Sequence, residues 1–483
     1  MQPEELIKLA TKVQHLQCEF QTIKVKAAHK GCPTRLFDTL SSFSNQDEGG
    51  IIIFGLNEET KFETVGVYDP QDLQKKITEQ CKQMSPMVRA LFTVAELGDK
   101  IIVSAEIPSV DITERPVFYQ GVGRSKGSYI RVGDSDEPMS EYEIYSYDAF
   151  RKRIRDDIRI VPEAKATFFD AEKVANYLMN VKHKRKNLAT NISDDEILEL
   201  MGIMSNGIPT LAGELCFSRY PQGMFPQLCV TAVSIPGTEM GDIGNSGERF
   251  IDNERITGSI GEMVEAAVDF VRRNSRTMTI IDNNGKRIDR EEYPPKAVRE
   301  AIINALVHRD YSIHTENVPV RMEMYRDRLK IISSGGLYGK ITIDALGKVR
   351  SETRNAALAN ILELMQITEN RYSGIPTIRA ELKEQGLPDP SFKVERGEFV
   401  VVFRNNLQEE LKRDFQPITA GVANHALLDF CEIPRSRKEL VEYTGYSQYY
   451  TMTTIVKPLL EAGLLKMTMP EKPGSKNQRF VKG

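Results

Sequence analysis

The alternation of apolar and polar positions predicts mixed helices and strands from the start of the chain. Within residues 1–150, apolar residues recur at helical spacing over 34–45. The glycine-bounded run 49–55 (GGIIIFG) predicts a short buried strand. Further strands are expected at 100–107 and 128–132. The first 150 residues are therefore predicted to form a small α/β domain.

A second, larger α/β domain is predicted from residue 195 to residue 408. Its pattern indicates helix, strand, helix, helix, strand and strand at 192–204, 227–235, 261–274, 295–309, 318–325 and 328–334. Residues 151–194 are rich in helix formers and are predicted to be a helical bridging region. Two basic runs in that region, 151–155 and 182–186, are typical of solvated faces and less often of nucleic-acid contacts. Residues 409–424 are polar and predict a linker.

The last part of the chain, residues 425–483, predicts a compact DNA-binding module. Short helices are expected at 425–431 and 437–443, and a third helix is expected after Ser447. Two strands, at 464–467 and 478–481, follow the third helix. Three helices followed by a β-hairpin are typical of a winged helix-turn-helix domain.

Charge and side-chain chemistry within this module favour double-stranded DNA as the partner. Between residues 466 and 482 there are five basic residues and one acid, whereas the whole chain carries a net charge of −4. The third helix is expected to present polar side chains to base edges or phosphates. The predicted DNA-binding residues are Gln448, Tyr449, Tyr450, Thr451, Thr454, Lys457, Lys472, Lys476 and Arg479.

Composition narrows the class of protein without choosing a function. The chain has 483 residues, 40% of them hydrophobic, which is ordinary for a globular protein of about three domains. No apolar run is long enough to span a bilayer, and no secretory signal core opens the chain. The six cysteines are widely spaced and contain no CxxC pair. We therefore expect a cytoplasmic protein with reduced cysteines and no membrane partner.

A polar stripe on the helix predicted at 295–309 indicates a candidate nucleotide site. Glu300, Asn304 and His308 are four residues apart, so they share one face of the helix. That face is opposite the apolar side that contains Val298, Ile302 and Ala305. A stripe of this kind is often only a solvated face. Here the rest of the helix is strongly apolar, and a Ser-Ser-Gly-Gly turn follows the later strand.

This segment resembles the ATP-binding fold of the GHKL group (gyrase, Hsp90 and histidine kinases), in the divergent form found in bacterial transcriptional regulators. The resemblance implies a water-orienting carboxylate at Glu300, which would be the catalytic residue of any ATPase activity, and a Mg²⁺-binding amide at Asn304. ATP and Mg²⁺ are the implied cofactors. The implied nucleotide-binding residues are Glu300, Asn304, His308, Gly335, Gly336 and Gly374.

The sequence departs from the GHKL pattern at two places. The group's adenine-contacting aspartate is absent, and Ser333-Ser334-Gly335-Gly336 stands in its place. The later phosphate loop is reduced to Tyr372-Ser373-Gly374-Ile375. No GxxxxGK[ST] motif occurs, which excludes a Walker-type ATPase. These departures favour nucleotide binding over hydrolysis.

Residues 1–150 are similar to the Schlafen AlbA-type domain. The motifs that carry the resemblance are 18–21 (CEFQ), 43–45 (FSN), 49–55 (GGIIIFG) and 129–133 (YIRVG). Some members of that family cleave RNA with clustered carboxylates, and a metal-dependent reaction needs several of them. The matching positions here contain the acid Glu19 but also three amides, Gln14, Gln21 and Asn57, with Glu58 beside the last. A binding domain is therefore expected rather than a nuclease.

These observations predict an α/β multi-domain protein with an AlbA-like α+β domain, a GHKL-like α/β sandwich and a C-terminal winged helix. The expected function is that of a nucleotide-responsive transcriptional regulator, acting as a homodimer or higher homo-oligomer because two-fold DNA sites need two-fold proteins. Two alternatives remain: an ATP-dependent or nuclease component of a defence system, and a scaffold whose winged helix contacts proteins. Turnover of ATP or RNA would favour the first, and failure to retain DNA at low salt would favour the second.

Overall fold

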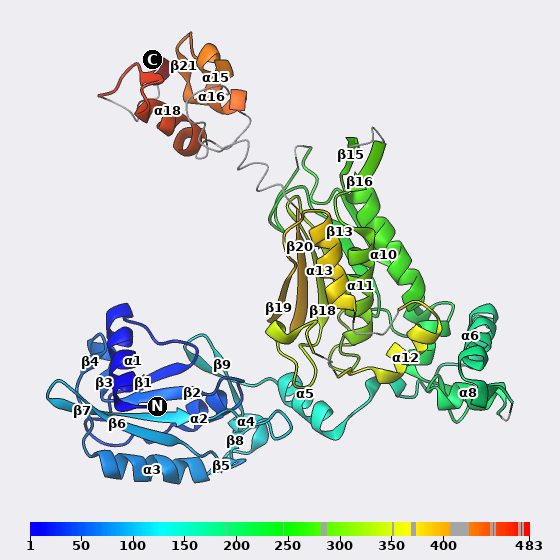
Figure 1. The fold of residues 1–483 in the computed structure, drawn as a ribbon, viewed down its shortest axis with the longest axis horizontal. Helices are drawn as coiled ribbons and strands as arrows, with labels where there is room; N and C mark the ends of the chain where they lie inside the picture. Colours follow the sequence, from blue (N-terminus) through cyan, green and yellow to red (C-terminus); the bar gives the residue numbers. More distant parts are fainter. Residues whose placement is uncertain are drawn as a thin grey trace. The chain divides into compact units, whose positions relative to one another are not determined.

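A computed structural model describes all residues except 191, 245, 282–286, 350–351, 369–372, 406–424, 445–447, 449–450, 472–474 and 476–477. The chain divides into two compact units, Met1–Asn405 and Asn406–Gly483 (Figure 1). None of the described helices is both long and apolar enough to cross a lipid bilayer.

The N-terminal domain is built on a four-stranded sheet of order β1-β2-β7-β6, in which β1 and β2 are parallel and the other pairs antiparallel. Alternate residues of the strands face opposite sides, so each face has its own hydrophobic core. Its main elements are α1 (Pro3–Leu16), β1 (Ile23–Lys26), α2 (Phe37–Ser44), β2 (Gly50–Phe54), α3 (Pro70–Lys82), β6 (Leu91–Leu97), β7 (Lys100–Ile107), β9 (Tyr129–Val132) and β10 (Ser135–Pro138). The predicted helix and the three predicted strands of this region are confirmed.

The segment after β10 is helical and joins the core of the next domain. Its elements are α5 (Glu141–Lys152), α6 (Ala171–Lys184), α7 (Lys186–Ala189), α8 (Asp194–Leu200) and α9 (Leu211–Phe217). Buried side chains such as Tyr177 of α6 and Phe217 of α9 belong to the same hydrophobic cluster as the larger sheet. Most of the predicted bridging region is thus part of one core with the domain that follows it.

The larger sheet has six strands in the order β14-β13-β17-β18-β20-β19. Only β13 and β17 pair in parallel, and every other pair is antiparallel. The strands are β13 (Val230–Ser234), β14 (Asp252–Ile256), β17 (Val320–Met324), β18 (Arg328–Ser334), β19 (Ser391–Glu395) and β20 (Glu398–Arg404). A hairpin of β15 (Thr277–Ile281) and β16 (Arg287–Glu291) precedes the central helix. The predicted strands at 227–235, 318–325 and 328–334 correspond to β13, β17 and β18.

Helices cover one face of this sheet and position the site described below. They are α10 (Ile260–Asn274), α11 (Pro295–His308) and α13 (Gly374–Glu384) (Figure 1). Helix α12 (Ala356–Leu364) packs against α6 and α9 instead. Helix α10 begins at a capping box formed by Ser259 and Glu262, and α11 begins with Pro295 at its first turn. The apolar side of α11 packs inward, and Val298, Ile302 and Ala305 are all buried. The opposite side of α11 is thereby turned toward α13 and the loop after β18.

The C-terminal unit has its own small hydrophobic core, which includes Leu440, Leu459 and Phe480. Three strands form a sheet of order β21-β23-β22, all antiparallel. The elements are α15 (His425–Phe430), β21 (Arg435–Ser436), α16 (Arg437–Thr444), a π-helical turn (Thr451–Val456), α18 (Lys457–Glu461), β22 (Leu465–Met467) and β23 (Arg479–Lys482). The two predicted short helices and the two predicted strands are present.

Candidate functional site

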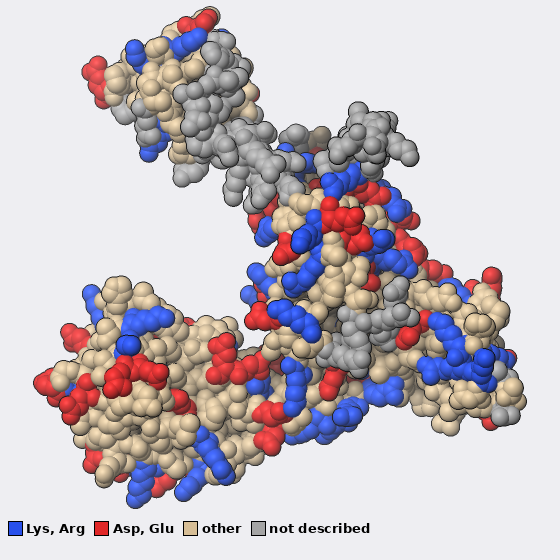
Figure 2. Space-filling view, viewed as in Figure 1, with Lys and Arg blue, Asp and Glu red and all other residues tan. Residues whose placement is uncertain are grey.

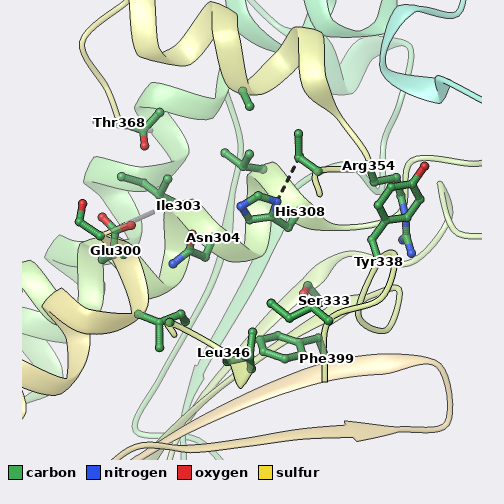
Figure 3. Close-up of a pocket in the computed structure, with 18 of the residues that line it drawn as sticks. Glu300, Ile303, Asn304, His308, Ser333, Tyr338, Leu346, Arg354, Thr368 and Phe399 are labelled. Carbon is green, nitrogen blue, oxygen red and sulfur yellow. Dashed lines mark hydrogen bonds between the residues drawn. The ribbon is translucent and has the colours of Figure 1, made fainter. Parts of the chain in front are cut away.

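A cavity of about 560 Å³ lies between α11, α13, the loop after β18 and the segment before α12. This volume is within the usual range for a small-molecule site. Glu300, Asn304 and His308 project from α11 into it (Figure 3). The predicted glycines Gly335, Gly336 and Gly374 also line the cavity. The six residues selected from the sequence therefore share one cavity, although 74 residues separate Glu300 from Gly374.

Gly374 brings the first turn of α13 unusually close to the polar stripe of α11. A Cβ atom at this position would lie 2.3 Å from Glu300 Oε1 and 3.0 Å from Asn304 Nδ2. Only a residue without a side chain leaves space for both groups. The first turn of a helix also presents unpaired N–H groups, which favour anions. The Glu300 end of the cavity thus combines a carboxylate, an amide and a helix N-terminus.

The amide of Asn304 is available to a ligand. It makes no hydrogen bond within the described part of the chain, and it points into the cavity (Figure 3). An amide oxygen is a suitable ligand for Mg²⁺, which prefers oxygen donors and keeps several waters. Among the described residues no group of three or more His, Cys, Asp or Glu side chains could hold a metal ion alone. Any Mg²⁺ here would therefore need oxygens from a bound phosphate.

His308 lies farther along α11 and is neutral at physiological pH. Its imidazole lines the cavity and is exposed there. Desolvation by the surrounding protein atoms, together with the neighbouring Arg354 guanidinium, lowers the pKa of His308 to about 4. The ring nitrogen Nδ1 is 3.4 Å from the Thr353 hydroxyl oxygen. His308 can therefore act as a hydrogen-bonding group but not as a cation.

Arg354 was not selected from the sequence, yet it is the most buried cation that lines the cavity. Its side chain is 9% exposed, and its Nη1 atom is 3.3 Å from Asp310 Oδ2. Gly335 permits this placement, because a Cβ atom there would lie 2.2 Å from the same Nη1. The ring of Tyr338 is 5.3 Å from the guanidinium carbon. No sequence motif marked Arg354, because its role depends on chain segments that only the fold brings together.

The apolar part of the lining was also missed at the level of sequence. It is formed by side chains from α11, the loop after β18, the segments before and after α12, α13 and β20. These include Ile303, Val307, Leu337, Ile341, Leu346, Ile367, Ile375 and Phe399. An apolar wall with a few convergent polar groups is typical of a ligand pocket. Hydrophobic periodicity predicted such residues as core, since it cannot distinguish a core from a cavity wall.

The carboxylate expected from the AlbA resemblance belongs to a closed ionic network. Glu19 Oε2 is 3.5 Å from Arg131 Nη2, and Asp136 Oδ1 is 3.0 Å from Arg131 Nη1. Asp136 also accepts hydrogen bonds from Ser42 and Thr39, at 2.6 Å and 2.7 Å. Burial raises the pKa of Glu19. These partners occupy the carboxylates and give them a stabilising role, and the described residues contain no group of three or more His, Cys, Asp or Glu that could hold a metal ion.

The amides at the other family positions have structural partners too. Gln14 donates to the carbonyl of Phe62 at 2.9 Å and to the Thr64 hydroxyl at 3.1 Å. Asn57 accepts a hydrogen bond from the backbone N–H of Glu59, at 3.3 Å. These hydrogen bonds hold both amides in place within the domain.

One predicted DNA-binding residue is placed differently from the expectation. Thr451 is fully buried, and its hydroxyl is 2.9 Å from that of Thr444. The expectation that Thr451 is exposed is wrong, because it lies four and eight positions before Ile455 and Leu459. This spacing puts it on the apolar face of the helical segment. Thr451 therefore cannot reach a base edge while this packing persists.

The other predicted DNA-binding residues are exposed or lie outside the described residues. Gln448 and Lys457 are exposed. The Arg479 side chain is half exposed and is 3.4 Å from Glu439. The structure does not describe Tyr449, Tyr450, Lys472 and Lys476, nor the side chain of Thr454.

Two family models match separate parts of the chain. Residues 17–140 match "Schlafen, AlbA_2". Residues 317–403 match "Putative ATP-dependent DNA helicase recG C-terminal". The chain therefore contains a Schlafen AlbA_2 domain and a RecG-like C-terminal domain. The second match begins after α11, so Glu300, Asn304 and His308 lie outside it.

Solved structures with low similarity are also found. The DIP2311 protein of Corynebacterium diphtheriae is 16% identical, over 100% of this chain and 97% of that one, with a TM-score of 0.39. The N-terminal domain of a RecG-related protein from Nitrosomonas europaea is 23% identical, over 28% of this chain and 93% of that one, with a TM-score of 0.22. No curated protein matches the chain.

Proposed function

We propose that this chain is a DNA-binding transcriptional regulator that responds to a nucleotide bound in the cavity. The observation that carries the proposal is the polar wall formed by Glu300, Asn304 and the first turn of α13, in a cavity of about 560 Å³. A phosphate-bound Mg²⁺ needs oxygen ligands, and a helix N-terminus favours anions. Asn304 would contribute a ligand to Mg²⁺, and Glu300 is placed to orient a water molecule.

The RecG-like and AlbA-type domains support a DNA-related role. DNA contact is assigned to the C-terminal unit, in which helical segments are followed by the paired strands β22 and β23. In Figure 2 the visible face has acidic and basic side chains interspersed. A local contact by a winged helix, with Arg479 on its second wing strand, fits this distribution.

Calorimetric titration of ATP and ADP, with and without Mg²⁺, tests the nucleotide site. We expect Mg²⁺-dependent binding, and Asn304→Ala should weaken it about tenfold because one ligand of the hydrated cation is lost. Asn360→Ala is the matched control, since Asn360 contacts Arg185 outside the cavity. Wild-type protein that binds neither nucleotide at millimolar concentration would contradict the proposal.

Gel-shift measurements at several salt concentrations test the DNA surface. Lys472, Lys476 and Arg479 should be replaced together with alanine. The slope of log affinity against log salt concentration should then become shallower by up to about three, because roughly one counterion is released for each phosphate contact. Gln448→Ala should instead lower discrimination between specific and random DNA. An unchanged salt slope in the triple variant would refute the assignment of the wing.

Coupling between the two sites is the regulatory part of the proposal. If the nucleotide is an effector, DNA affinity must change when nucleotide is present, and DNA must change nucleotide affinity by the same factor. Light scattering of the same samples measures the expected homodimer or higher homo-oligomer. If DNA affinity does not change with nucleotide, the protein binds DNA but the proposed regulation by nucleotide is wrong.

A further inference from the structure

The cavity extends along α11 and has two chemically different ends. Glu300 and His308 are eight residues apart, which corresponds to about 12 Å along a helix. Glu300 and Gly374 mark one end, and Arg354 lies beyond His308 at the other (Figure 3). The inference below rests on the proposed function. If the phosphates and Mg²⁺ lie beside Glu300 and Asn304, the base of the nucleotide extends toward Arg354.

Arg354 has unused hydrogen-bonding capacity at this second end. A guanidinium carries five N–H donors and no acceptor. Within the described part of the chain Arg354 makes no hydrogen bond, and its buried Nη1 lies near Asp310 without adequate geometry. Buried donors without partners are costly, especially on a charged group. Nη1 is sealed from solvent, whereas the side chain as a whole is 9% exposed and lines the cavity, so its remaining donors are suited to an acceptor on a ligand.

The carboxylate closest to Arg354 is already occupied. Asp310 Oδ1 accepts the backbone N–H of Ser312 at 2.7 Å, and Asp310 Oδ2 accepts the hydroxyl of Tyr142 at 2.9 Å. Asp310 is also buried, and it is not part of the cavity lining. It therefore cannot accept a hydrogen bond from the amino group of a base.

Arg354 is the only full cation at this end among the described residues that line it, because desolvation and the Arg354 charge lower the pKa of the neighbouring His308 to about 4. A guanidinium donates two parallel hydrogen bonds to the O6 and N7 acceptors of a 6-oxopurine. A 6-aminopurine presents a donor at the same position, which would oppose the guanidinium donors. We propose that Arg354 binds the acceptor edge of the base, so that the cavity selects guanine-type nucleotides over adenine nucleotides.

The expected preference is large enough to measure. A site built to hydrogen-bond one group rejects analogues that leave its buried polar atoms unpaired. Calorimetry with full-length protein should show Mg-GTP and Mg-ITP binding at least about tenfold more tightly than Mg-ATP. ITP shares O6 and N7 with GTP but lacks the 2-amino group, so equal affinity for GTP and ITP assigns the contact to the 6-oxo edge.

Variants of Arg354 separate reading of the base from binding of phosphate. Arg354→Ala should bring the ratio of GTP to ATP affinity close to one and leave the affinity for inorganic tripolyphosphate unchanged. Arg354→Lys keeps the charge but cannot donate in parallel, so its ratio should also fall. Arg299→Ala is the matched control, because Arg299 lines the same cavity but is paired with Glu265. Its ratio should equal that of the wild type.

Four results would overturn the proposal. Two concern the wild type: equal affinity for GTP and ATP, or a GTP affinity at least about tenfold above that for ITP. Two concern Arg354→Ala: an unchanged ratio of GTP to ATP affinity, or an equal loss of tripolyphosphate binding and GTP binding. In the last case Arg354 contacts phosphate or supports the fold, and circular dichroism of Arg354→Lys distinguishes these roles. If the wild type binds no nucleotide at all, the proposed function fails together with the inference. If it binds nucleotides without base preference, only the inference fails.

Discussion

Arg131 and Arg354 are both buried arginines next to an aspartate. Within the described part of the chain, Arg131 donates several hydrogen bonds and Arg354 donates none. Arg131 is 0% exposed and donates to Asp136, Glu19 and the carbonyls of Phe20 and Ile23. Arg354 is 9% exposed and makes no hydrogen bond among the described residues. The first arginine closes a network within the AlbA_2 domain, and the second faces a cavity.

This difference indicates which of the two charged centres can serve a ligand. In the Arg131 network, hydrogen bonds from Ser42 and Thr39 and the charges of Lys24 and Arg131 outweigh burial and lower the pKa of Asp136. The network engages both Nη atoms of Arg131 and leaves its buried Nε without a partner. At Arg354 no donor is hydrogen-bonded within the described part of the chain, and Nη1 is sealed from solvent beside Asp310. Burial of a charge therefore does not identify a functional residue, whereas unused hydrogen-bonding capacity at a cavity does.

The largest expected effect is on the closed network. Arg131→Met should destabilise the N-terminal domain by about 3–5 kcal/mol, because it removes the buried guanidinium between two buried carboxylates and leaves them only Lys24 as a cation. Hydrogen exchange of the β1 and β2 amides measures this domain separately from the rest of the chain. Arg354→Met should change the exchange of the β18 amides little. Equal destabilisation by the two variants would remove the distinction between the centres.

A smaller effect is expected from Gly374→Ala at the Glu300 end of the cavity. The new Cβ would displace the ends of two flexible side chains, Glu300 and Asn304, rather than backbone atoms. Nucleotide affinity should therefore fall roughly tenfold while the melting temperature changes little. Gly241→Ala serves as the control, since a Cβ there meets no atom within 4 Å. If Gly374→Ala binds nucleotide with the wild-type affinity, the short distance between α13 and the polar side of α11 plays no part in ligand binding.

The smallest effect is a pH dependence due to His308, whose pKa is lowered to about 4 from an ordinary value of 6.5. Below pH 6.5 the unfolded chain binds a proton that the folded protein does not. Stability should thus fall as the pH drops from about 6.5 to about 4, with no contribution from His308 above that window. Melting temperatures of the wild type, His308→Gln and the surface control His183→Gln measure this. An identical acid response in all three proteins would contradict the assigned environment of His308.

The order of elements and the residues on α11 could be predicted because they depend on local spacing. The four-residue interval from Glu300 to Asn304 to His308 places all three side chains on one helix face, whatever surrounds the helix. The same rule, applied to 451, 455 and 459, would have placed Thr451 on the apolar face. Threonine is polar, but its position on the helix decides whether it is buried. Strands β14, β19 and β20 and helices α12 and α13 were not predicted.

By itself, the sequence determined the periodic elements, the AlbA_2 resemblance and the polar stripe that faces the cavity. Only the tertiary structure decided that Gly374 meets Glu300, that Glu19 is enclosed by Arg131, and that Arg354 lines the cavity beside His308. Hydrophobic periodicity is a local property, whereas the partners of a charged side chain come from segments far apart in the chain. Whether an arginine closes a network or remains available to a ligand depends on these distant partners, so it could not be predicted from local pattern.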